Sequence, residues 1–182
     1  MGPAYLLDVV GIDTGHHAAK IMMESFPDRM SISGINILHA MFEAKRYGQK
    51  NGVGFYNYAL DTKGKTQKIK NSEVDAIINS VVKTKMEVSD EEIVHRMMLP
   101  MILECARCLE EKIVESATEV DMGLMLGLGF PPFRFGALKY ADDLGIAQVV
   151  SLAEKFKNYG GLFSIPHILE KMNANNEKFY QF

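Results

Sequence analysis

The stretch that decides the fold is residues 135–146, FGALKYADDLGI, because a diverged copy of it, MGPAYLLDVVGI, opens the chain at residues 1–12. The two copies share a G-x5-D-x2-G-I frame, in which Gly2, Asp8, Gly11 and Ile12 fall on Gly136, Asp142, Gly145 and Ile146. A repeated frame of this kind indicates an internal duplication. The second copy follows the segment GLGFPP at residues 127–132, whereas nothing similar precedes the first. We therefore expect that the chain begins inside a motif.

Bulk composition restricts the class of protein. With 182 residues, 47% hydrophobic and 24% charged, the chain has the composition of an ordinary soluble globular protein. Its net charge of -3 argues against a nucleic-acid partner, since such proteins usually carry a basic stripe. No apolar run approaches a membrane span, and no signal peptide is evident. Two cysteines without a disulfide framework fit a reducing compartment.

Apolar spacing predicts helices along nearly the whole chain, so the expected fold class is all-α. Capping boxes at residues 89–92 (SDEE) and 116–119 (SATE) mark two helix starts, and Asp13 or Thr14 is expected to cap an earlier helix. Three glycines within residues 48–54 predict a tight turn. The polar, lysine-rich segment 61–70, DTKGKTQKIK, is interpreted as an exposed linker, and we find no convincing alternating strands.

Apparent chemical motifs have structural explanations. Gly64-Lys65-Thr66 lacks the upstream glycine of a P-loop, and neither G-x-G pair follows a strand. The pair Cys105 and Cys108 has no further ligands for zinc, so buried packing is expected.

Two groups of cationic or titratable side chains also receive structural interpretations. Adjacent His16 and His17 point about 100° apart on a helix and do not converge on one ion, while His39 carries no signal. The lysines of residues 61–70 either contact phosphates of an anionic ligand or simply solvate a linker. No catalytic or metal set stands out, and no catalytic, cofactor-binding or metal-binding residue is expected in this chain.

Three motifs in order resemble one known family. Residues 2–13, the turn GQKNGVGFY at residues 48–56 and GLGFPPF at residues 127–133 are similar to the C-terminal helical region of 3-hydroxyacyl-CoA dehydrogenases, with spacing closest to the multifunctional fatty acid oxidation α subunits. The resemblance implies two tandem related helical domains. We expect a first, N-terminally truncated domain at residues 1–60, a linker and connecting helix at 61–88, and a second domain at 89–182.

The resemblance also implies a function. The parent enzyme would oxidise L-3-hydroxyacyl-CoA to 3-ketoacyl-CoA with NAD in fatty acid β-oxidation, alongside a thiolase subunit and in the cytoplasm. Its nucleotide-binding domain and catalytic His–Glu pair would lie N-terminal to this chain. The chain itself is then expected to bind no NAD, to be inactive alone, and to contribute the acyl-CoA cleft and a dimer-like interdomain interface.

Two positions depart from the family pattern. Leu126 stands where similar chains often have an aromatic residue assigned to substrate contact, and it can still pack against an acyl chain. Phe135 stands where a second glycine is common. An alternative interpretation of the whole chain is a free-standing, non-catalytic helical interaction module that kept the scaffold and lost the enzyme.

Overall fold

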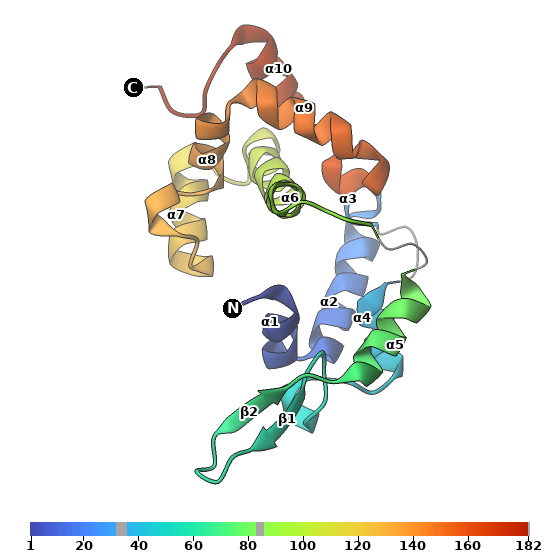
Figure 1. The fold of residues 1–182 in the computed structure, drawn as a ribbon. Helices are drawn as coiled ribbons and strands as arrows, with labels where there is room; N and C mark the ends of the chain where they lie inside the picture. Colours follow the sequence, from blue (N-terminus) through green and yellow to red (C-terminus); the bar gives the residue numbers. More distant parts are fainter. Residues whose placement is uncertain (32–35, 83–85, 182) are drawn as a thin grey trace. The chain divides into compact units, whose positions relative to one another are not determined.

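The chain forms two compact units, Met1–Met86 and Glu87–Phe182, each with its own core. The computed structural model describes residues 1–31, 36–82 and 86–181. These residues are mainly helical, with one two-stranded hairpin (Figure 1). The expected all-α class with two related helical units is confirmed. None of the helices in the described residues is long and apolar enough to cross a membrane.

The first unit is a small helical cluster with a hairpin. Its elements are α1 (Pro3–Val10), α2 (Ile12–Ser25), α3 (Pro27–Met30), α4 (Ile37–Glu43), the short 3-10 helix η1 (Gln49–Asn51), β1 (Asn57–Leu60), β2 (Thr66–Ile69) and α5 (Ser72–Val81). Buried Ile12, Met41 and Val74 form its centre, and Leu7 and Phe55 pack against them. The core therefore joins α1, α2, α4 and α5.

The hairpin corrects the interpretation of residues 61–70 as a linker. Strands β1 and β2 pair antiparallel, with Asn57 opposite Ile69 and Leu60 opposite Thr66. Asp61 organises the turn, because its Oδ1 accepts hydrogen bonds from the backbone N–H groups of Lys63 and Lys65, each at 2.8 Å. Strand β2 is fully exposed and has no apolar face, so alternation gave no signal. The aspartate-initiated turn closed by Gly64 was the available indication.

The second unit surrounds one long helix. Its elements are α6 (Asp90–Glu110), α7 (Ala117–Leu128), η2 (Pro132–Arg134), α8 (Ala137–Leu144), α9 (Ile146–Phe156), η3 (Lys157–Tyr159), η4 (Gly161–Phe163) and α10 (His167–Asn175). Helix α6 contacts α7, α8, α9 and α10, and Figure 1 shows it in the middle of this unit. Its buried Leu99, Ile102 and Leu103 belong to the large core of the unit.

Helix starts follow the predicted capping boxes in the second unit. Ser89 accepts a hydrogen bond from the N–H of Glu92 at 3.2 Å, and Ser116 accepts one from Glu119 at 3.3 Å. The expected cap at Asp13 or Thr14 is wrong. Helix α2 begins at Ile12 after Gly11 without a side-chain cap, and Asp13 instead pairs with Lys50.

Candidate functional site

The repeated aspartate is a buried junction in both units. The repeat frame places α1 on α8 residue for residue, and α2 and α9 both start at its final isoleucine. Asp8 is 1% exposed and accepts hydrogen bonds from the N–H groups of Phe55 at 2.8 Å and Tyr56 at 2.9 Å. The hydroxyl of Tyr58 donates a third, at 2.7 Å. The carboxylate thus ties α1 to a segment 47 residues away.

Asp142 makes the same junction in the second unit. Its two carboxylate oxygens accept hydrogen bonds from the N–H groups of Phe179 and Tyr180, each at 2.9 Å. A Phe-Tyr pair therefore follows the repeated helix pair in both units, at residues 55–56 and 179–180. This pair was a sequence signal of the duplication beyond the 12-residue frame, and it gives both aspartates a structural role.

A second carboxylate fastens α8 in the second unit. Asp121 on α7 is 2% exposed and accepts hydrogen bonds from the backbone N–H groups of Leu138 and Lys139, both at 2.9 Å. The hydroxyl of Tyr180 donates another, at 2.9 Å. Burial and this bond raise the pKa of Tyr180. Asp121 is therefore the N-terminal cap of α8, supplied from a different helix, and no sequence motif indicates this role.

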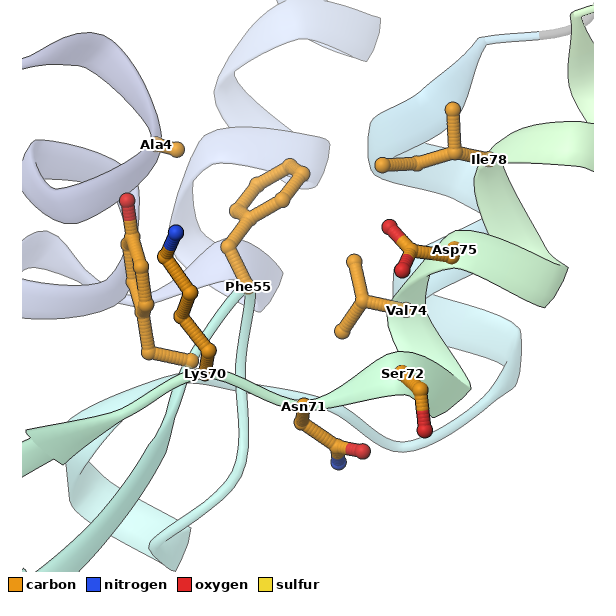
Figure 2. Close-up of a pocket in the computed structure, with 9 residues that line it drawn as sticks. Ala4, Phe55, Lys70, Asn71, Ser72, Val74, Asp75 and Ile78 are labelled. Atoms are coloured by element: carbon orange, nitrogen blue, oxygen red, sulfur yellow. The ribbon is translucent and has the colours of Figure 1, made fainter.

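A hollow in the first unit lies between the start of α1 and α5 (Figure 2). Its volume is about 680 Å³. Phe55 and Val74 face it with apolar side chains, while Lys70 and Asp75 supply opposite charges. Asn71 and Ser72 add further polar groups, so the lining of this hollow is mixed and does not indicate one class of ligand.

A smaller hollow of about 290 Å³ in the second unit is lined mainly by apolar atoms of α7 and Phe135. Met122 lines it, and Leu126, which is 80% exposed, lies one helical turn further along α7. The predicted substrate residue thus lies on an apolar, open face of α7.

Phe135 has a backbone conformation that favours glycine. Its φ of 62° lies in the left-handed region, which side chains with a Cβ rarely adopt.

Cys105, His16 and His39 occupy packing positions. Cys105 is buried on α6, where burial raises the pKa of its thiol to about 12 and keeps it protonated. His16 stacks on Phe42 with ring centroids 4.5 Å apart, and His39 approaches His16 at 5.3 Å. The contact of His39 with His16 was not predicted from the sequence, because it forms only when α4 packs against α2. Burial, then neighbouring histidines, lower the pKa of His16. Within the described residues no histidine, cysteine and carboxylate group is arranged to hold a metal ion.

The described residues do not fit NAD. A dinucleotide fold places the pyrophosphate on a glycine turn between a parallel strand and a helix. The sheet among the described residues consists of two antiparallel strands closed by the Asp61 turn. The lysines in and around this hairpin are exposed, namely Lys63, Lys65, Lys68 and Lys70. The Lys68 ammonium lies over the rings of Tyr5 and Tyr56, at 4.8 and 4.5 Å from the ring centroids.

Comparison with known proteins identifies the scaffold. The model of the 3-hydroxyacyl-CoA dehydrogenase, C-terminal domain, matches residues 1–58 and 93–179. The chain belongs to this family. The match is interrupted where β2 and α5 lie, and it includes both repeated helix pairs together with Phe55, Tyr56 and Phe179 of their junctions. The predicted resemblance is confirmed.

The family relatives are much longer proteins. Fatty acid oxidation complex subunit alpha of Pseudomonas paraeruginosa is 51% identical over 180 residues, which cover 99% of this chain and 25% of the relative. The protein of the same name from Pseudomonas syringae pv. tomato matches equally, at 51% identity over 180 residues, with the same coverage. The chain thus spans about a quarter of the length of these relatives.

Solved structures share the fold. The dehydrogenase part of multifunctional enzyme 1 from C. elegans aligns with a TM-score of 0.66 at 24% identity, covering 94% of this chain and 38% of that one. The 3-hydroxybutyryl-CoA dehydrogenase from Escherichia coli K12 also gives a TM-score of 0.66, at 16% identity, covering 96% of this chain and 51% of that one. At these identities the likeness concerns the fold of the family.

Proposed function

We propose that the chain is the C-terminal helical part of an NAD-dependent L-3-hydroxyacyl-CoA dehydrogenase of fatty acid β-oxidation. The observation that carries this proposal is the 51% identity over 99% of the chain to relatives named as α subunits of a fatty acid oxidation complex. In this proposal NAD and the catalytic base belong to another part of the enzyme, acting in the bacterial cytoplasm beside a thiolase subunit. This chain contributes a wall of the acyl-CoA cleft and an interdomain surface.

The decisive test is a chimera. In it, this chain replaces the matched 180 residues of the Pseudomonas paraeruginosa relative. We expect the chimera to reduce acetoacetyl-CoA with NADH and the isolated chain to show no turnover, because the carbonyl that accepts the hydride needs a positioned general acid to supply its proton. NADH absorbance follows both reactions. Turnover by the isolated chain would contradict the proposal. A folded but inactive chimera would favour a non-catalytic interaction module.

We further propose that Leu126 contacts the acyl chain. Its exposed side chain continues the apolar face of Met122, and an exposed residue can be changed without disturbing the core. In the chimera, Leu126→Asn should raise KM for a medium-chain substrate about five- to twentyfold with little change in kcat, since an apolar contact made in both ground and transition states is lost.

Ile113→Asn is the matched control for this substitution. Ile113 is 70% exposed in the same unit but lies beyond the end of α6. Its KM should stay unchanged. Equal KM values for both variants would remove Leu126 from the substrate cleft.

A further inference from the structure

The two copies of the repeat differ at the N-terminal ends of their first helices, α1 and α8. In the second unit, α8 begins against Asp121, which accepts hydrogen bonds from the N–H groups of Leu138 and Lys139. The matching residues of α1 are Ala4 and Tyr5, whose first-turn N–H groups have no acceptor within the helix. The residue before α1, Gly2, provides no side-chain cap.

The space that Asp121 occupies in the second unit is open in the first. A Cβ on Gly136 would lie 2.2 Å from Cγ of Asp121, so that carboxylate packs directly on the glycine. A Cβ on the matching Gly2 would meet nothing within 4 Å. Tyr56 takes the place of Tyr180, whose hydroxyl also binds Asp121, because both tyrosines follow the repeated aspartate junction. The first unit thus repeats the first-turn N–H groups and the tyrosine that surround Asp121 in the second unit, but it has no matching carboxylate.

The two helices also differ in burial, and α1 is the more exposed of the two. On α8, Ala137, Leu138 and Ala141 are fully buried, and the helix contacts α6 and α7. Their counterparts on α1 are Pro3, which is exposed, and Ala4 and Leu7, which are half-buried.

The outward face of α1 is apolar as well. Leu6, Val9 and Val10 are 48%, 44% and 54% exposed, and the one charged residue of the helix, Asp8, points into the junction. A helix that is apolar on nearly all sides is normally covered.

From these observations we infer that the start of α1 is a docking site for a helix that carries an aspartate. The occupant is a helix pair built like α6 and α7. Its aspartate side chain accepts hydrogen bonds from the N–H groups of Ala4 and Tyr5, and its apolar side chains cover α1. The Lys68 ammonium over the rings of Tyr5 and Tyr56 adds positive charge beside this docking site. The inference concerns an interaction surface and does not depend on the proposed dehydrogenase activity.

A graft tests the inference in the full chain. A copy of residues 89–134, which contains α6, α7 and η2, is joined directly ahead of Met1, so that the repeat frame stays in register. Hydrogen exchange at the amides of Ala4 and Tyr5, followed by NMR, is the readout. We expect exchange to slow roughly ten- to a hundredfold, as for a hydrogen bond to a charged group.

Substitutions within the grafted copy make the test specific. Asp121→Asn in the copy should remove most of the added protection, whereas Glu115→Gln, which removes an exposed carboxylate from the same copy, should leave it intact. A second graft uses the 46 residues upstream of the matched region in the Pseudomonas paraeruginosa relative. Unprotected Ala4 and Tyr5 amides in both grafts would overturn the inference, as would equal protection with aspartate and asparagine.

Discussion

Gly48→Ala is expected to unfold the first unit, with a loss of roughly 4 kcal/mol or more in its free energy of unfolding. A Cβ on Gly48 would lie 2.2 Å from the backbone oxygen of Asp8, and backbone atoms cannot move aside as a flexible side-chain end can. The φ of 101° at Gly48 adds conformational strain for any residue with a Cβ. The substitution therefore separates α1 from the turn that binds the Asp8 carboxylate.

Gly64→Ala is the matched control for this experiment. Gly64 also has a positive φ, 74°, but its added Cβ would meet nothing within 4 Å. Its cost should be limited to strain, about 1 kcal/mol. Urea unfolding followed by circular dichroism, with hydrogen exchange to assign the loss to residues 1–86, measures both variants. Similar losses for the two would show that strain, and not the close approach to Asp8, decides the requirement for glycine.

Asp121→Ala is expected to cost the second unit about 3–5 kcal/mol. The change leaves the N–H groups of Leu138 and Lys139 and the hydroxyl of Tyr180 without their shared acceptor in a mostly buried site. Thermal unfolding should shift to a clearly lower midpoint. The amides of residues 179–180 should also lose protection from hydrogen exchange, because Tyr180 is held by Asp121 and Asp142 together.

Asp143→Ala distinguishes this junction from ordinary surface charge. Asp143 lies on the same helix that Asp121 caps, and it forms an ion pair with Lys139 while its side chain remains 52% exposed. An exposed pair of this kind contributes at most about 1 kcal/mol. If the Asp143 and Asp121 variants lost stability equally, the buried junction would not be the main support of α8.

Local signals predicted the helical elements well. The capping boxes at Ser89 and Ser116 depend on residues three positions apart, and both form as expected. The glycine turn at residues 48–54 also appears, with positive φ at Gly48 and Gly52. These features were predictable because each is specified by the backbone preferences of a few neighbouring residues.

Signals failed where a side chain found a distant partner. Asp13 looked like a cap but pairs with Lys50, and His39 looked isolated but lies beside His16. The hairpin was missed because the exposed strand β2 has no buried face to impose alternation. Leu126 as a substrate contact stays a prediction, as do the proposed domain boundaries.

The sequence by itself determined the helical class, the duplication and the family, because periodicity, caps and the G-x5-D-x2-G-I frame are written in adjacent residues. Only the tertiary structure decided what the repeated aspartates do. Asp8 reaches Phe55 across 47 residues, and Asp121 reaches Leu138 from another helix across 17. A buried carboxylate is stable where several N–H and O–H groups converge on it, and that convergence exists only after the helices have packed.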